Sequence, residues 1–414
     1  MTDTTDYAAD FIPTRHGADI HGARQMLGIL TRILPDAKPS DERWQAMGQA
    51  LMQGDESMDE LLQWMTGKGM KTTRPQFEQA ITAGIDSLKR PPAVLRRFFE
   101  QVEQPPEWLD QNQIDLACQL HQRAGMASVY VGRDVALLGG YQASAFNKTL
   151  ILTGALQKGP TRRFAETLQW ALDITSDEGL RPGGCGYQST LRVRLIHALV
   201  RRHVQQMPEW RMAEWGLPIN QTDMAATLLG AVFVPMVGAQ LMGMPMTRNE
   251  REALAHHARY TGWLIGVDEA WLPRSYREAL ILLYQFLLSL SNPDETSPQM
   301  AMPLADEPLS RPYPNLSWLR GRLNRSRHLS ISKAFLGKQS MRNLGLPENS
   351  LPWYPALAVP ANLLRHSSSW LLPGGKTRQA KRGRAAQQAF LDTMTGKQAA
   401  QIGEAASGIL NSKA

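Results

Sequence analysis

The stretch Thr190-Leu-Arg-Val-Arg-Leu-Ile-His-Ala-Leu-Val-Arg-Arg-His203 contains no Gly or Pro and many strong helix formers, so it predicts one helix. On such a helix His197 shares a face with Arg194, three positions earlier, and Arg201, four positions later. Val residues recur on the same face at helical spacing: Val193, Val200 and Val204. A face that mixes Val with His and Arg is expected to be at least partly buried, and guanidinium groups placed there need anions or hydrogen-bond acceptors.

Two interpretations of this face are open. In the first, the negative partner is a haem, whose iron takes the neutral imidazole of His197 while its propionates take the two arginines. In the second, His197 is an ordinary core histidine, and Arg194 and Arg201 pair with carboxylates of the protein. The spacing alone does not decide between them.

Length and composition predict a globular chain with a sizeable core. The 414 residues are 43% hydrophobic and 20% charged. Lys and Arg number 45 against 38 for Asp and Glu, a modest surplus spread along the chain that does not indicate nucleic-acid binding. The two cysteines, Cys118 and Cys185, imply no disulfide framework. The acidic start lacks an apolar segment typical of a secretory signal, so a cytoplasmic location is expected.

Proline positions divide the chain. Residues 1–104 contain helical patterns interrupted by Pro91-Pro92 and are expected to be accessory, and Pro105-Pro106 marks the next boundary. Residues 105–292 form the predicted core, and 293–314, with six prolines and no periodicity, a long connection. Residues 315–414 are expected to be helical with a basic tail that is solvated or contacts an acidic lipid or protein. Few segments alternate with period two, so the fold class is all-α.

Two further segments of the core stand out. The helix predicted from Thr161 to Trp170 places Arg163, Glu166 and Thr167 on one face. The segment 224–245 is nearly free of polar residues and almost long enough to span a membrane, but Pro235 and Gln240 lie inside it. We therefore expect a buried core helix that Pro235 kinks.

Several chemistries are absent from the sequence. It holds no Cys-x-x-Cys-His, so a haem would be bound non-covalently as haem b. His-Glu-x-x-His and Glu-x-x-His, typical of zinc hydrolases and of bundle di-iron sites, do not occur. Adjacent His256 and His257 point to different faces and make a poor metal pair. The Gly-rich loop 179–186 matches no phosphate-binding pattern and is interpreted as a flexible connection.

A series of short motifs occurs in a fixed order. They are Pro106-Glu-Trp-Leu-Asp110, Leu152-Thr-Gly154, Arg163-x-x-x-Thr167, Arg194-x-x-His197-x-x-x-Arg201, Thr222-Asp-Met-Ala-Ala-Thr227, Gly238-x-x-x-x-Gly243, Thr247-x-x-Glu250 and Gly262-Trp-Leu-Ile-Gly266 with the Val-Asp-Glu-Ala-Trp-Leu-Pro273 that follows. Over roughly residues 105 to 290 the chain resembles the catalytic domain of latex-clearing-type rubber oxygenases. It is equally similar to the related endoplasmic-reticulum-bound oxygenases of mycophenolic acid biosynthesis.

This resemblance implies a globin-like helical core that holds haem b, with His197 as the proximal iron ligand. Arg194 and Arg201 would lie near the propionates or brace the helix, and Arg163 and Thr167 match distal motif residues. The chain departs from the rubber oxygenases at two places. Glu166 stands where they have an iron-capping lysine, and residues 140–165 contain no acidic residue to match their upstream glutamate base. Both departures argue against rubber cleavage.

The resemblance therefore implies an oxygenase that uses dioxygen on an apolar small-molecule or polymer substrate. Glu166 is the candidate proton shuttle, provided that burial and Arg163 tune its pKa, although an exposed pair with Arg162 or Arg163 is an equal alternative. Thr167 either donates a hydrogen bond to iron-bound oxygen or bonds back to its own helix. A non-catalytic haem protein and a cofactor-free helical interaction module remain alternatives, as does peripheral membrane contact.

Overall fold

The computed structural model describes residues 10–17, 34–154 and 159–395. The acidic start and the last part of the C-terminal region discussed above lie outside these ranges. The structure is 74% helical, and the described residues include no strand. The predicted all-α class is confirmed.

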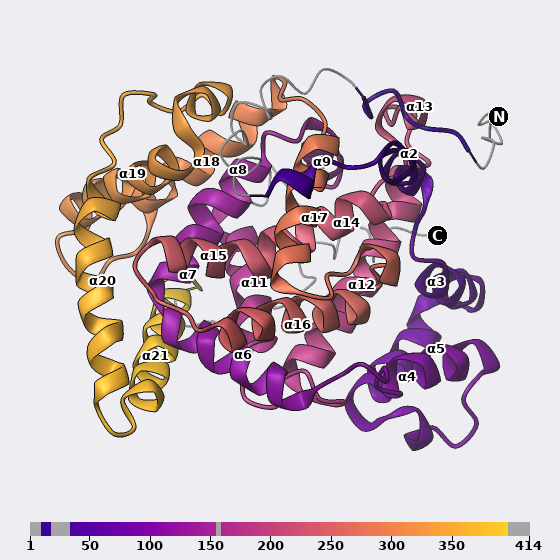
Figure 1. Ribbon diagram of the computed structural model, residues 1–414. Coiled ribbons are helices and arrows are strands. Elements are labelled where there is room, and N and C mark those ends of the chain that lie inside the picture. Colours follow the sequence, from indigo (N-terminus) through magenta and orange to yellow (C-terminus); the bar gives the residue numbers. More distant parts are fainter. Residues whose placement is uncertain (1–9, 18–33, 155–158, 396–414) are drawn as a thin grey trace.

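The N-terminal helices pack at one side of the molecule, in indigo and purple at the right of Figure 1. They are α2 (Asp41–Gln49), α3 (Glu56–Lys68), α4 (Met70–Ala83) and α5 (Ala93–Glu103), with short 3₁₀ turns at Pro35–Ala37, Ala50–Met52 and Ile85–Ser87. Asp55 caps α3 by accepting from the Met58 N–H. Apolar side chains of α3, α4 and α5 belong to the same buried cluster as Leu191 and Leu195 of the helix predicted from Thr190 to His203. The main core therefore crosses the expected boundary at residue 104.

The middle of the chain forms a helical body between the N-terminal and the C-terminal helices, and the predicted helix is its element α12 (Figure 1). Its elements are α6 (Gln111–Ala124), α7 (Met126–Val131), η4 (Gly132–Leu137), α8 (Leu138–Gly140), α9 (Ser144–Leu152), α11 (Pro160–Asp173), α12 (Cys185–Val204), α13 (Met212–Trp215), α14 (Gln221–Leu228), η5 (Leu229–Phe233), α15 (Val234–Leu241), α16 (Arg248–Ile265), η6 (Glu269–Trp271) and α17 (Tyr276–Ser289). Thr247 and Glu250 form a reciprocal capping box that starts α16.

The long apolar segment is one helix with a distortion, Gln221–Leu241, and it is long and apolar enough to cross a membrane. Of its most apolar window 56% is buried, and Leu229, Val232 and Phe233 lie in the main core. The expected kink takes the form of a π-helical segment, η5, which ends immediately before α15 and Pro235. A proline has no N–H for the helix ladder and its ring crowds the carbonyl four residues earlier, so the preceding turn widens.

The C-terminal helices form the opposite side of the molecule, in orange and yellow in Figure 1. They are α18 (Thr296–Ser310), α19 (Ser317–Asn343, bent at Gly337), α20 (Trp353–Leu371) and α21 (Gly375–Thr395). The connection predicted over 293–314 is wrong, because α18 occupies most of it. Met300, Ala301, Leu304 and Ala305 are buried at helical spacing in the second apolar cluster, and this packing outweighs the cost of Pro303 and Pro308 inside the helix.

Candidate functional site

Helices α11 and α12 form a tight hairpin. The loop between them is not the flexible connection expected from its glycines: a Cβ on Gly186 would lie 2.7 Å from the Asp173 carbonyl oxygen and from Ile174 Cα. Trp170 of α11 donates to the hydroxyl of Thr190 of α12 over 3.0 Å. Arg163 precedes Trp170 by as many residues as His197 follows Thr190. In an ideal antiparallel pair of helices this spacing would place Arg163 at the level of His197.

His197 lies half-buried in the second half of α12. Its Nδ1 atom is buried and has no hydrogen-bond partner. Burial, followed by the positive charge of Arg201, lowers the pKa of the imidazole to about 4, although Asp55 acts in the opposite direction. The ring is therefore neutral at pH 7, which is the form that binds a metal.

Arg194 is buried and makes a bidentate ion pair with Asp55 of the α3 cap. Nε lies 2.6 Å from Oδ2 and Nη2 lies 2.8 Å from Oδ1. The third contact is to the carbonyl oxygen of Leu264 at 3.2 Å. This forked geometry is the strongest form of the Arg–carboxylate pair, and it ties α12 to α3 and to the end of α16.

Arg201, two turns after Arg194 on α12, is also held by a carboxylate and a backbone carbonyl. Its Nη2 lies 2.8 Å from Asp59 Oδ1, and its Nη1 donates to the Ile219 carbonyl oxygen over 2.6 Å. Asp55 and Asp59 are one turn apart on α3, so this helix supplies a carboxylate to each of the two arginines that flank His197. The guanidinium charges are balanced by the protein itself.

The residues predicted on the other side of the site lie along α11. The guanidinium carbon of Arg163 lies 6.0 Å from the centre of the Tyr141 ring. The Glu166 carboxylate, 14% exposed, lies 3.6 Å from Arg162 Nε. Thr167 is exposed, and its hydroxyl donates to the Arg163 carbonyl oxygen over 3.0 Å. The structure thus places all three on one helix beside α12, with Glu166 and Thr167 engaged by neighbours on α11.

Sequence reasoning missed two features near this body. The first is a pair of π-helical segments, η4 and η5, that pack against each other. Single-turn π segments occur often at functional sites. The signal for η5 in the sequence is Pro235, which follows the last residue of η5 by two positions. The Pro235 ring also lies against η4, because a Cβ added at Gly132 would be 3.5 Å from Pro235 Cγ.

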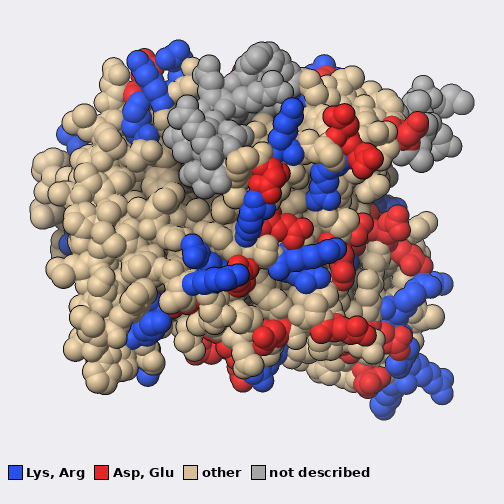
Figure 2. Space-filling model, in the orientation of Figure 1, with Lys and Arg blue, Asp and Glu red and all other residues tan. Residues whose placement is uncertain are grey.

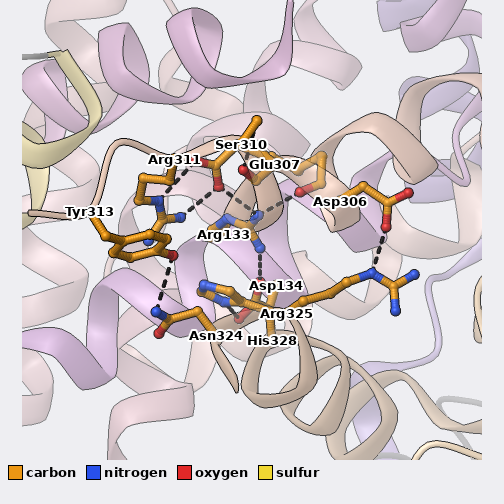
Figure 3. A network of polar contacts seen from close by, with 11 residues as sticks. Arg133, Asp134, Asp306, Glu307, Ser310, Arg311, Tyr313, Asn324, Arg325 and His328 are labelled. Carbon is orange, nitrogen blue, oxygen red and sulfur yellow. Dashed lines mark hydrogen bonds and ion pairs between the residues drawn. The ribbon is translucent and has the colours of Figure 1, made fainter. Parts of the chain in front are cut away.

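The second is a buried network of charges (Figure 3). Arg133 of η4 is fully buried and contacts Asp134 at 2.6 Å and Glu307 of α18 at 3.1 Å. Glu307 also pairs with Arg311 at 2.6 Å, and Asp134 Oδ2 lies 2.6 Å from Nδ1 of His328 on α19. Burial, followed by the charge of Arg133, lowers the pKa of His328 to about 4. The network joins the C-terminal helices to η4.

The adjacent histidines of α16, His256 and His257, both have hydrogen-bond partners. His256 accepts from the Asp110 N–H, whereas His257 contacts the Ile174 carbonyl oxygen, both at 2.9 Å, so the two rings do point in different directions. Among the described residues, no three His, Cys, Asp or Glu side chains are grouped so that they could hold a metal.

These features define a large all-helical protein whose central helix carries a neutral imidazole between two internally paired arginines. The chain belongs to the family described as ER-bound oxygenase mpaB/B'/Rubber oxygenase, catalytic domain, whose sequence model matches residues 119–370. The resemblance drawn from the motifs is confirmed, and the match runs beyond residue 292 into α20.

The chain is also similar to one protein in sequence and to one solved structure in fold. The chain is 25% identical over 206 residues to a rubber oxygenase of Streptomyces sp. (strain K30), which is 49% of this chain and 48% of that protein. It thus spans about half the length of this curated relative. A solved structure of Latex Clearing Protein LCP in the closed state matches with a TM-score of 0.65 at 19% identity, covering 83% of this chain and 91% of that one. The likeness to LCP shows a shared fold.

Proposed function

We propose that this protein is a haem b-dependent oxygenase that acts with dioxygen on an apolar substrate, and that His197 is the proximal iron ligand. The observation that carries the proposal is the imidazole itself. It is neutral at pH 7, its buried Nδ1 has no partner, and it lies on α12 between two anchored residues, Arg194 and Arg201. A haem iron needs only one or two protein ligands, because the porphyrin supplies the others.

The residues around His197 fit this role by fixing the helix that carries it. Asp55 holds Arg194 and Asp59 holds Arg201, so both arginines orient α12. Because each guanidinium already has a carboxylate partner, bracing the helix is the role that their contacts support best, and contact with haem propionates would add to it. When bound, the haem supplies the redox chemistry with dioxygen, and the protein supplies orientation and exclusion of water.

The face of α11 is the proposed distal side. Glu166 would hold or move a proton at its carboxylate, whose exposure of 14% and position beside Arg162 suit a partly desolvated acid. Arg163 would orient a bound molecule from the level of His197. Thr167 now bonds to its own helix, so a hydrogen bond to a bound ligand requires rotation of its hydroxyl away from the Arg163 carbonyl.

The substrate is proposed to be apolar and oxidisable, as the name of the rubber oxygenase relative suggests for that protein. Glu166, in place of the lysine that the resemblance implies, and the lack of an acidic residue in 140–165 favour a substrate other than rubber.

The proposal is tested by the absorption spectrum of the purified full chain, oxidised and then reduced with dithionite under carbon monoxide. A haem gives a Soret band that shifts on reduction and carbon monoxide binding. His197→Ala is expected to abolish this band, because the iron loses its protein ligand. His203→Ala, on the same helix, is the matched control and retains it.

Three results would contradict the proposal, each at a different step. A colourless protein that cannot be reconstituted with haem favours the helical interaction module. A Soret band unchanged in His197→Ala removes the ligand assignment. A haem protein that consumes no dioxygen with any of a panel of alkenes is a non-catalytic haem binder, and the oxygenase proposal fails.

A further inference from the structure

A cavity of about 270 Å³ lies far along the chain from His197, between the end of α6, the end of α20 and the first half of α21. Four arginines line it: Arg123, Arg365, Arg378 and Arg382. No carboxylate is among its lining residues. Four guanidinium groups around one opening produce a positive potential that attracts anions.

Arg123 is the buried centre of this cluster. Its side chain is 3% exposed, and its Nη1 lies 2.7 Å from Glu250 Oε1. Its Nε and Nη2 atoms are buried and have no hydrogen-bond partner. Lys376 shares the same carboxylate oxygen at 3.1 Å, so one carboxylate serves two cations. Buried donors without acceptors are costly, and a bound anion would supply the missing acceptors.

The other three arginines at the opening have no carboxylate partner among the described residues. Arg378 and Arg382 are exposed on α21 and form no ion pair with a described residue. They lie one helical turn apart, so both side chains reach the same side of α21. The Nη2 of Arg365 contacts His366 Nε2 at 3.2 Å, and burial lowers the pKa of this guanidinium.

Two helices of the cavity wall are in close backbone contact. Helix α21 crosses the junction of α6 and α7 at Gly383 and Gly125, where a Cβ on Gly383 would lie 2.0 Å from the Gln122 carbonyl oxygen. Gly125 has a φ of +54°, which few other residues adopt. Gly375, the first residue of α21, also lines the cavity, so the positive end of a 21-residue helix adds to the arginine charges.

We propose that this cavity binds a phosphate group. Arginine forks match the tetrahedral oxygens of phosphate, and the arrangement of several arginines with a helix N-terminus is typical of phosphate recognition. We favour the headgroup of an anionic lipid as the molecule that carries this phosphate group, because the rim of the cavity is apolar. Leu372 lines the cavity and is 55% exposed, and Leu364 and Leu371 on the adjoining end of α20 are 75% and 84% exposed.

The surface around α20 agrees with this source. Figure 2 shows that the part of the molecule over α20 carries few charged side chains, whereas acidic and basic groups crowd the opposite part of that face. Exposed leucines beside a basic cavity let acyl chains lie against the protein while the phosphate enters the site.

The test uses the full chain and two probes, inorganic phosphate by isothermal titration calorimetry and vesicle flotation. One set of vesicles contains phosphatidylglycerol in phosphatidylcholine, and the other contains phosphatidylcholine alone. The test variant is Arg378→Gln/Arg382→Gln, at two exposed positions that line the cavity. The control variant, Arg74→Gln/Lys381→Gln, removes the same charge at exposed positions outside the lining.

The test variant is expected to bind phosphate roughly tenfold or more weakly than the wild type, because charge-assisted contacts are lost, and the control to stay within about twofold. Binding to phosphatidylglycerol vesicles that the test variant alone loses, and that phosphate competes away, identifies the lipid. Phosphate binding without vesicle binding identifies a free phosphate compound.

The proposal is overturned if the wild type binds neither probe, or if test and control variants lose binding equally, which would indicate general surface charge. If the double variant unfolds by circular dichroism, the single variants Arg378→Gln and Arg382→Gln are measured in the same way. The site does not depend on the haem proposal, so His197→Ala is expected to retain phosphate binding.

Discussion

Asp55 and Arg194 are 139 residues apart in the sequence and form the buried contact that fixes α12 most firmly. Replacing Asp55 by Ala leaves the Arg194 guanidinium buried without its carboxylate, and we expect a loss of roughly 3–5 kcal/mol in the free energy of unfolding. Chemical denaturation followed by circular dichroism measures this loss. Because α12 also carries His197, the proposed haem ligand, the proposal predicts a lower haem content in the same variant.

The matched control is Glu60→Ala on the same helix. Glu60 pairs with Arg97 at 2.6 Å, but the two side chains are 54% and 65% exposed, so the expected change is below about 1 kcal/mol. Equal effects of the two substitutions would mean that the Asp55 pair contributes no more than a surface ion pair.

At the scale of single residues, the sequence predicts what depends on local geometry. The shared face of Arg194, His197 and Arg201 follows from helix spacing, and the structure confirms that this face is largely buried. The partners Asp55 and Asp59 were not predictable, because no local pattern relates α3 to α12. The haem roles of these residues, and those of Arg163, Glu166 and Thr167, remain predictions.

At the scale of elements, the α11–α12 hairpin depends on a glycine. A Cβ at Gly186 would lie 2.7 Å from Asp173 O and 2.7 Å from Ile174 Cα, both backbone atoms that cannot turn aside. Gly186→Ala is therefore expected to force the helices apart and to lower the free energy of unfolding by about 1–3 kcal/mol. Thermal and chemical unfolding measure the change.

Gly67→Ala gives the comparison for this substitution. Gly67 is exposed on α3, and an added Cβ there meets nothing within 4 Å, so the variant gains about 0.5–1 kcal/mol from reduced chain entropy. If Gly186→Ala also stabilises the protein, the close approach of the two helices is not required by the fold.

At this scale the two wrong predictions from the sequence both depend on prolines or glycines. The prolines between residues 293 and 314 predicted a connection, yet the buried face of Met300, Leu304 and Ala305 stabilises a helix around them. The glycines of 179–186 predicted flexibility, but they permit close packing instead. In both cases packing outweighs the local preference of the residue type.

At the scale of the whole molecule, the absence of period-two patterns was enough to predict an all-α fold. The joining of the C-terminal helices to the body was not predictable. It depends on the buried network of Arg133, Asp134, Glu307, Arg311 and His328 in Figure 3, whose members come from η4, α18 and α19. Each charge in it has a partner only after the chain has folded.

Buried histidines make the stability of the whole fold depend on pH. Burial lowers the pKa of His257, His328 and His366 to about 4, and that of His121 well below 6.5. In the unfolded chain these groups take up protons as the pH falls through about 6.5, whereas in the native state they stay neutral until about 4. Protons therefore bind preferentially to the unfolded chain in this window, and stability is lost as the pH falls.

We expect His257, His328 and His366, whose pKa is lowered to about 4, each to contribute a loss of up to about 3 kcal/mol between pH 6.5 and pH 4. Most carboxylates are still ionised over the upper part of that range. Urea unfolding at intervals from pH 7.5 to 4.5 measures the slope. His366→Gln is expected to flatten it, because it removes one group whose pKa differs between the two states. A free energy of unfolding that stays constant from pH 7.5 to 4.5 would show that these rings accept protons inside the native fold.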